Sequence, residues 1–295
     1  MGKALKAVGL LVALLVGLAA AGIGWLVYDG KRTPAGTSEY VALGSSFGAG
    51  PGITPIDPNA PVLCDRSAAN YAHLLSAKRN LNLTDMTCSG ATAINVLDGG
   101  QFFQGPQIDA LRPGTKLVTV TVGGNDISYL GNLFAWSCES RPKAIDAIWR
   151  LLVCKVTPQE VVQQKLEGLE GTMLRIADEV HRRSPQATLV FVDYATVLPD
   201  AGQCPDRLPI TTDELDQIRL LSDRLKAVTF DVAQRSRATI VEASEVTKGH
   251  DICSAEPWVF GWTMPTTPLS FGPMGFHPTG KAMRRIADAV DQALH

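Results

Sequence analysis

The sequence has little charge and no excess of positive charge. Charged residues make up 19% of its 295 residues, and 27 lysines and arginines against 29 acidic residues give a net charge of −2. Without a positive field the chain cannot gather phosphates, which excludes a strongly basic nucleic-acid-binding protein. The hydrophobic share of 45% excludes a disordered chain, a collagen-like chain and a membrane protein with many spans. The sequence also lacks internal repeats and low-complexity segments.

Motifs for metals and nucleotides are missing as well. The sequence holds no C-x-x-C and no cluster of cysteine and histidine with the spacing of a zinc site, so we expect no metal site. A glycine-rich turn at residues 44–52 lacks the G-K-[ST] of a P-loop and the glycine spacing of a dinucleotide-binding loop. These absences argue against phosphate binding at that turn.

One long apolar run is present, at the N-terminus. Residues 7–28 form a run of 22 residues without a charge, with Lys3 and Lys6 before it and Lys31 and Arg32 after it. About 20 apolar residues span a bilayer, whereas the apolar region of a signal peptide is usually about 7–15 residues long. The length of the run therefore favours an uncleaved signal anchor.

A cleaved signal peptide is the alternative, with the three alanines at 19–21 as its cleavage site. In both cases the positive residues before the run favour a cytoplasmic N-terminus and export of the rest of the chain. We expect a signal anchor or signal peptide over residues 1–33, a linker over 34–38 and one domain over 39–295. This domain would lie outside the cytoplasm, anchored in the cell membrane by the N-terminal helix or, after cleavage, secreted.

The cysteines agree with export. All six follow the apolar run, and an even number of cysteines in an exported chain indicates three disulfides. They are Cys64, Cys88, Cys138, Cys154, Cys204 and Cys253. Six cysteines can pair in many ways, so their spacing leaves the connectivity open.

Strand and helix patterns alternate along the rest of the chain. Apolar stretches predict strands at 40–43, 81–86, 116–122, 188–193 and 239–242. Helical patterns occupy 67–79, 91–97, 157–183, 211–237 and 278–294, with Thr212 and Asp213 as candidate caps of the fourth. This alternation predicts an α/β domain in which helices cover both faces of a parallel sheet. Ligands of such sheets bind at the carboxyl ends of the strands.

Small polar residues gather where three of these strands end. The turns are GSSFGAGPG at 44–52, CSGAT at 88–92 and GGND at 123–126. Of the five histidines, His277 alone leads into a helix from a loop rich in aromatic residues, whereas His73, His181, His250 and His295 lie in helical patterns, in a polar loop or at the terminus. A hydroxyl nucleophile, a base and several amide donors are the groups that acyl transfer requires.

The motifs together resemble those of the SGNH, or GDSL-type, hydrolases. The matching residues are Gly44-Ser45-Ser46-Phe47, Gly90, Gly123-Gly124-Asn125-Asp126 and His277-Pro278, in the order that the family has them. More narrowly, the chain resembles the family's secreted actinobacterial esterases and lipases with six cysteines, from about residue 40 to the C-terminus. The resemblance implies a three-layer α/β/α sandwich with a flavodoxin-like sheet, after the N-terminal hydrophobic helix. It also implies hydrolysis of acyl esters without a metal or organic cofactor.

The resemblance assigns a role to each matching residue. Ser46 matches the nucleophile and His277 the general base. The backbone N–H groups of Ser46 and Gly90 and the side-chain amide of Asn125 match the oxyanion hole. The implied disulfides are sequential, Cys64–Cys88, Cys138–Cys154 and Cys204–Cys253. We expect a monomer that binds an ester or lipid substrate, contacts the membrane through its N-terminal helix and binds no nucleic acid.

The sequence departs from the family at two positions. Ser45 stands where the family usually has aspartate, and it leaves two adjacent hydroxyls, of which Ser46 occupies the nucleophile position. Met274 stands where the family often has the aspartate that orients the base. We therefore expect a Ser–His dyad whose imidazole is oriented by a main-chain carbonyl within Gly272–Met274. A carboxylate from elsewhere in the chain is the alternative.

Other features allow two interpretations each. The aromatic residues Trp258, Phe260, Trp262, Phe271 and Phe276 could form ordinary core or an apolar wall for an acyl chain. Residues 144–153 could form a lid or a core insertion, and Asp126 is expected to brace the turn that carries Asn125. Besides an exported esterase or lipase, we considered a deacetylase of O-acetylated cell-wall polysaccharide and a catalytically silent protein of the cell envelope that keeps the fold.

Overall fold

The computed structural model describes residues 2–32, 38–140, 154–263 and 274–295. Five parallel strands form one sheet in the order β2-β1-β3-β4-β5. The strands are β1 (Tyr40–Gly44), β2 (Leu83–Asp85), β3 (Leu117–Thr121), β4 (Thr188–Val192) and β5 (Thr239–Val241). β1 and β3 are buried along their whole length, as expected of inner strands that are covered on both faces.

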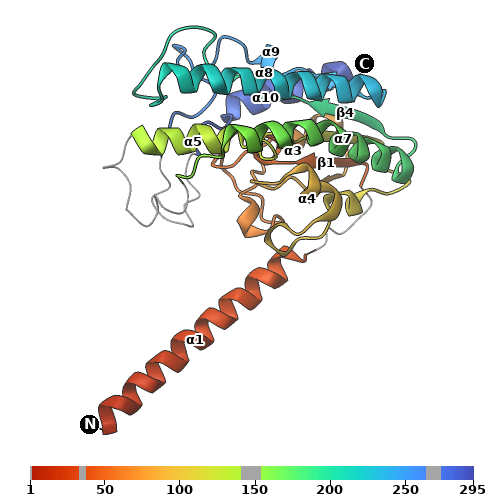
Figure 1. Cartoon of the computed structure of the whole chain (residues 1–295). Helices are drawn as coiled ribbons and strands as arrows, with labels where there is room; N and C mark the ends of the chain where they lie inside the picture. Colours follow the sequence, from red (N-terminus) through yellow and green to blue (C-terminus); the bar gives the residue numbers. More distant parts are fainter. Residues whose placement is uncertain (1, 33–37, 141–153, 264–273) are drawn as a thin grey trace.

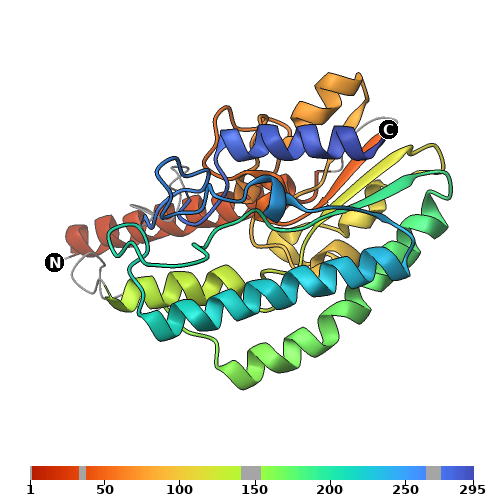
Figure 2. The ribbon, with the colours of Figure 1, turned by 90° about the horizontal axis from the view of Figure 1, so that it is seen from above.

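Helices pack on both faces of this sheet (Figure 2). The longer ones are α3 (Tyr71–Arg79), α4 (Ala93–Asp98), α5 (Tyr129–Ser140), α7 (Gln159–Arg183), α8 (Thr212–Arg235) and α10 (Gly280–Ala293), and short ones are α2 (Ser46–Ala49), α9 (Ala243–Val246), η1 (Val62–Cys64), η2 (Gln101–Phe103) and η3 (Gln107–Ala110). α3 and α10 lie on one face, and α5, α7 and α8 on the other. The predicted α/β/α sandwich with its flavodoxin-like strand order is confirmed.

Several element boundaries differ from the prediction for local reasons. α3 begins at Tyr71 rather than at residue 67, because the side chain of Asn70 accepts a hydrogen bond from the His73 N–H and caps the helix. α8 is capped by Thr211 in a reciprocal capping box with Glu214, not by the two following residues. α5 is a helix where none was predicted, and the segment 144–153 lies outside the described residues.

Three disulfides join parts of the domain. They link Cys64 to Cys88, Cys138 to Cys154 and Cys204 to Cys253, which is the pairing that the resemblance implies. The first lies beside the end of β2 and holds the loop that carries Gly90 against η1. The Gln104 amide contacts both of its sulfur atoms, at 3.1 and 3.2 Å.

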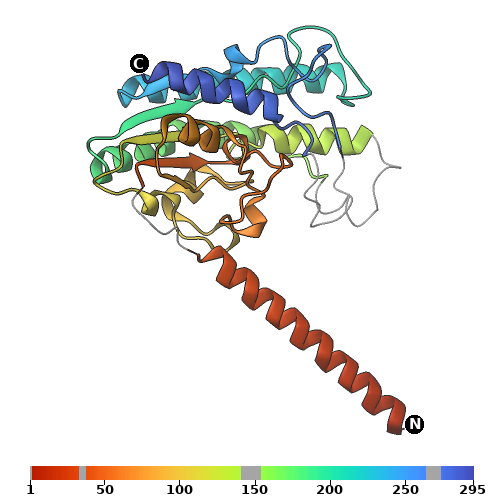
Figure 3. The ribbon, with the colours of Figure 1, turned by 180° about the vertical axis from the view of Figure 1, so that it is seen from behind.

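The N-terminal helix α1 (Gly2–Gly30) projects away from the domain (Figures 1 and 3). A stretch of 18 residues within 6–30 has a mean hydropathy of 2.5, and this stretch, which could cross a membrane, is not buried against the domain. The C-terminal end of α1 contacts η1 and η2 of the domain, and the Asp29 carboxylate there accepts a hydrogen bond from the Val62 N–H at 2.7 Å and also pairs with Arg32. Most of the expected linker, residues 34–37, lies outside the described residues.

Candidate active site

The turn from β1 into α2 brings Ser46 to the carboxyl edge of the sheet. Gly44 has a φ of 134°, and a Cβ atom at this position would lie 2.1 Å from the Thr121 carbonyl oxygen, so only glycine fits. The Ser45 N–H donates to the same carbonyl at 2.8 Å, and α2 begins at the next residue. The chain therefore turns from strand into helix at Ser46, the position at which this type of turn carries a nucleophile, and Ser46 is 5% exposed there.

The Ser46 hydroxyl faces the His277 imidazole. Ser46 Oγ lies 2.8 Å from His277 Nε2, and His277 Nδ1 lies 2.8 Å from the Gly275 carbonyl oxygen. A carbonyl only accepts hydrogen bonds, so Nδ1 carries the proton and Nε2 is free to accept the proton of Ser46. The carbonyl at Nδ1 belongs to Gly275, one residue beyond the range that the sequence analysis gave.

The His277 side chain is buried and held neutral. Burial lowers its pKa to about 4, and the hydrogen bond to Gly275 opposes this shift only in part. Among the described residues, no carboxylate contacts the imidazole ring. The imidazole is therefore unprotonated at neutral pH, the form that can accept a proton.

Backbone pairing fixes the segment that carries His277. The Phe260 N–H donates to the His277 carbonyl at 2.9 Å, and the Phe276 N–H donates to the Phe260 carbonyl at 2.9 Å. Val259 and Pro278 form an antiparallel bridge beside these bonds. The chain before α10 is thus pinned to the segment 258–262, which sets the direction of the His277 side chain.

The described aromatic residues around this segment act mainly as core. Phe276 is fully buried and packs edge-to-face on Phe134, with the ring centroids 6.4 Å apart. Phe260 and Trp262 are partly buried against the core, and the Trp258 ring stacks on His250 at 3.6 Å. Phe271 lies outside the described residues. These contacts indicate that the described aromatic residues belong to the core and do not form a wall for an acyl chain.

The three predicted oxyanion donors come from the ends of three neighbouring strands. Ser46 follows β1, Gly90 follows β2 and Asn125 follows β3, and these strands are adjacent in the sheet. Within the described ranges, the N–H groups of Ser46 and Gly90 donate no hydrogen bond. Asn125 Nδ2 donates one hydrogen bond, to the Ala91 carbonyl at 2.9 Å, so the second hydrogen of this amide remains for a ligand.

Asp126 ties two of these loops together. Both of its carboxylate oxygens lie 3.0 Å from the Ala93 N–H, at the first turn of α4. Burial raises the pKa of Asp126 to about 6. The carboxylate thus connects the loop after β3 to the loop after β2, a longer reach than the local bracing of the Asn125 turn that we expected.

Tyr194 belongs to the site although no motif in the sequence pointed to it. Its buried hydroxyl lies 2.9 Å from Ser45 Oγ and accepts a hydrogen bond from the Gly124 N–H at 3.0 Å. Its ring lies 4.3 Å from that of Phe47, whose ring is 5.4 Å from the imidazole of His277. Ser45 therefore bonds to the scaffold instead of facing the base. The signal in the sequence was the position of Tyr194, two residues after the end of β4.

The sequence and the fold match known lipases. Residues 42–285 match the GDSL-like Lipase/Acylhydrolase family. The chain is 31% identical over 273 residues to Lipase 2 of Streptomyces coelicolor, covering 90% of this chain and 88% of the relative. Its structure is similar to that of an extracellular lipase from Streptomyces rimosus, with a TM-score of 0.65, 22% identity and coverage of 87% and 100% of the two chains. A phospholipase A1 from Streptomyces albidoflavus has a TM-score of 0.68, 23% identity and coverage of 88% and 100%.

The chain therefore belongs to the GDSL-like lipase/acylhydrolase family, and it has the fold of the Streptomyces lipases. The protein is accordingly a carboxylic ester hydrolase, as expected from its motifs. An ester or lipid is the class of substrate that this membership implies.

Proposed function

We propose that the protein is an exported serine esterase or lipase that cleaves acyl esters with Ser46 and His277. The observation that carries this proposal is the 2.8 Å contact between Ser46 Oγ and the unprotonated Nε2 of His277. No other described serine hydroxyl makes such a contact with a histidine ring.

The reaction follows from this geometry in two steps. His277 Nε2 takes the proton of the Ser46 hydroxyl while Oγ attacks the ester carbonyl, and the proton then passes to the leaving alcohol. Water next attacks the acyl-enzyme and gives a proton to the same nitrogen, which passes it to Ser46 Oγ as the bond to the acyl group breaks, so the acid leaves and the Ser46 hydroxyl and neutral His277 are restored. The oxyanion of each tetrahedral intermediate is stabilised by the N–H groups of Ser46 and Gly90 and by the Asn125 amide.

We propose an orienting role for the Gly275 carbonyl. It holds the proton of His277 at Nδ1 and so keeps Nε2 directed at Ser46. A carbonyl carries no full charge, so it stabilises the imidazolium that forms during the reaction less than a carboxylate would. The proposed site is thus a Ser–His dyad whose imidazole is oriented by the neutral Gly275 carbonyl.

The destination of the domain is part of the proposal. Apolar α1, the positive residues before it and three disulfides support export, with residues 1–33 as a membrane anchor and 39–295 as the catalytic domain. An anchored protein keeps its N-terminus and fractionates with membranes. Recovery of only a soluble form that begins near Gly22 would show cleavage instead.

A panel of p-nitrophenyl esters from acetyl to long acyl tests the catalytic proposal and the substrate class together. The purified full-length protein should hydrolyse the esters, and Ser46→Ala should abolish turnover. Ser45→Ala is the matched control, because it removes the adjacent hydroxyl without touching His277. If Ser46→Ala kept full activity while Ser45→Ala lost it, the assignment of the nucleophile would be wrong. Activity on acetyl esters alone would favour a deacetylase over a lipase.

A further inference from the structure

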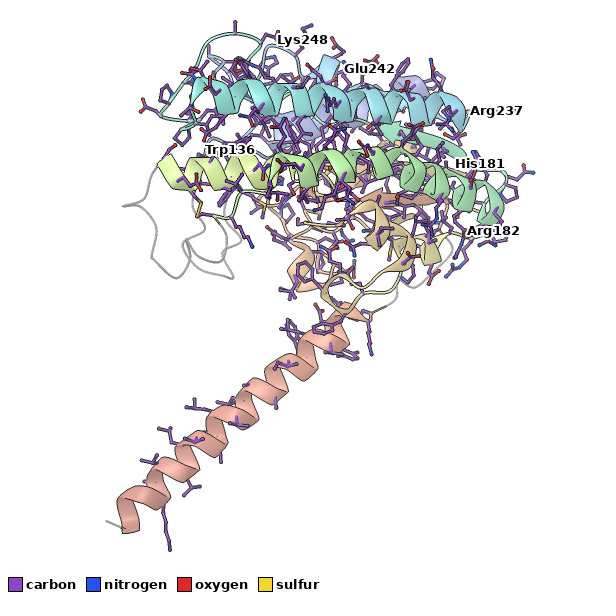
Figure 4. The ribbon with its side chains drawn as sticks, in the orientation of Figure 1. Trp136, His181, Arg182, Arg237, Glu242 and Lys248 are labelled. Atoms are coloured by element: carbon purple, nitrogen blue, oxygen red, sulfur yellow. A yellow bond between two sulfur atoms is a disulfide. The ribbon has the colours of Figure 1, made fainter. Side chains whose placement is uncertain are left out.

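The domain surface beside the end of α1 includes two segments that carry no charge of their own, although the Arg32 side chain lies against one of them and donates to the Ala60 carbonyl at 2.8 Å. The helix contacts η1 and η2 of the domain, which overlap residues 58–63 and 99–107. Neither segment contains a lysine, arginine, aspartate or glutamate. By contrast, Arg237, Glu242 and Lys248 lie on the side of the domain turned away from α1 (Figure 4). These two domain segments therefore form a patch without charges of its own, with Lys31 and Arg32 of the following chain at its border.

Two phenylalanines project from this patch in an unusual conformation. Phe102 and Phe103 leave 40% and 50% of their surface exposed. Both have a left-handed backbone, with φ angles of 46° and 66°, which bulky residues rarely adopt. Exposed apolar side chains on a strained turn do not stabilise the isolated domain, and such strain concentrates at functional sites.

The end of α1 is fixed directly against these phenylalanines. A Cβ atom at Gly30 would lie 2.2 Å from the Phe102 carbonyl oxygen and 3.3 Å from Phe103 Cβ, so the helix backbone packs closely on the turn. The bond between Asp29 and the Val62 N–H holds the same helix end on η1. The turn around Phe102 therefore lies at a defined height along the axis of α1.

When α1 spans a bilayer, the turn around Phe102 lies at the level of the lipid headgroups. The 25 residues from Lys6 to Gly30 give a helix of about 37 Å, somewhat longer than the hydrocarbon core of about 30 Å. Trp25 and Tyr28 are exposed near its C-terminal end, and such residues favour the interface between membrane and water. Gly30 and the two phenylalanines that it contacts then lie just beyond the hydrocarbon.

We propose that Phe102 and Phe103 insert into the surface of the phospholipid bilayer that holds α1, so that the catalytic domain rests on this membrane. This inference depends on the membrane anchor proposed above. The uncharged segments 58–63 and 99–107 form the rest of the contact, because they can approach the lipid without burying a charge.

The same turn is bonded to the candidate active site. Gln101 Nε2 donates to the Ser89 carbonyl at 2.7 Å, next to Gly90. The Gln107 side chain accepts from the Gly44 N–H at 2.7 Å and donates to the Gly44 carbonyl at 3.1 Å. Contact with lipid at the phenylalanines would thus place the oxyanion loop close to the bilayer, and ester lipids of that bilayer become the nearest substrates.

Photolabelling in vesicles tests this contact without depending on hydrolysis. The full-length Ser46→Ala protein is inserted into phosphatidylglycerol vesicles that contain a phospholipid with a diazirine near its headgroup, and labelled peptides are mapped after irradiation. We expect labels on residues 99–105 as well as on α1. The double variant Phe102→Asn/Phe103→Asn should lose at least about fivefold of the label at the turn, because burial of the two rings drives the contact. Asparagine tolerates the left-handed backbone, so the turn is kept.

Phe230→Gln provides the matched control. Phe230 is a similarly exposed phenylalanine on α8, which lies on the side of the domain away from α1 (Figure 1), so its replacement should leave the labelling unchanged. Labels confined to α1, or equal labels in the double variant, would overturn the lipid contact and leave the anchor standing. Failure of the full chain to float with the vesicles would overturn both. Since the protein tested lacks Ser46, none of these results depends on the proposed catalysis.

Discussion

The two halves of the candidate site are held in different ways. On the nucleophile side, strand ends and buried side chains form a connected scaffold, in which Tyr194 links Ser45 to Gly124. On the base side, His277 depends on one main-chain acceptor, Gly275, and on backbone pairing with Phe260. The sheet therefore fixes the position of Ser46, the proposed nucleophile, whereas the local path of one loop fixes His277, the proposed base. The two sides should respond differently to substitution.

The largest effect is expected where the two sides meet. His277→Ala removes the proton acceptor of Ser46, so we expect kcat to fall by about 10⁴-fold or more, as when one member of a catalytic unit is lost. The double variant with Ser46→Ala should be no slower than either single variant, because the two groups act as a unit. Additive losses in kcat would show that they act independently.

Asn125 tests the oxyanion hole on the nucleophile side. Asn125→Ala removes one donor to the oxyanion and should lower kcat by about 10²–10³-fold with little change in KM. Asn132→Ala is the control, because Asn132 bonds to Thr157 away from the site. A kcat for Asn125→Ala within twofold of the parent would remove this residue from the oxyanion hole.

Tyr194 tests the scaffold behind the nucleophile. Tyr194→Phe leaves the buried Gly124 N–H without an acceptor, at an expected loss of about 1–3 kcal/mol in unfolding free energy. Displacement of the turn that carries Asn125 should also lower kcat about tenfold, since misplaced catalytic groups lose rate steeply. Tyr40→Phe removes a comparable buried hydroxyl, bonded to Thr119, and should lower stability alone. Equal kcat values for the two variants would limit Tyr194 to a structural role.

The smallest effect on kcat is expected from a change beside His277, whose imidazole is oriented by the neutral Gly275 carbonyl. Because burial lowers the pKa of His277 to about 4, the base stays unprotonated down to that pH, and kcat/KM should fall only as the pH drops through about 4. Met274→Asp places a carboxylate near the ring, which favours the protonated form and moves this fall to higher pH, with a severalfold change in kcat. An acid limb of the parent enzyme near the ordinary value of about 6.5 would show that the imidazole is more exposed or charge-stabilised. Folding of both proteins across the pH range is checked by circular dichroism.

The sheet could be predicted because each strand is marked by a short apolar run in the sequence. The buried runs around Val41 and Val118 read as strands by themselves, and parallel strands bring their carboxyl ends together. The turns after these strands carry Ser46 and Asn125, so the sequence could indicate where ligands bind. The confirmed fold and family follow from such short patterns.

Contacts between distant segments were not predictable. The carbonyl at His277 Nδ1 belongs to Gly275 because the chain path there is set by pairing with Phe260, and no local pattern encodes this pairing. Tyr194 reaches Ser45 across 149 positions of sequence. The left-handed turn at Phe102 likewise depends on where α1 leaves the domain.

Covalent labelling with diethyl p-nitrophenyl phosphate tests the central claim most directly. The reagent transfers its phosphoryl group to a serine whose hydroxyl is activated by a base, and mass spectrometry locates the adduct on the peptide. The dyad predicts a single adduct on Ser46, with labelling nearly lost in His277→Ala and retained in Ser45→Ala. An adduct on Ser45, or undiminished labelling of Ser46 in His277→Ala, would contradict it.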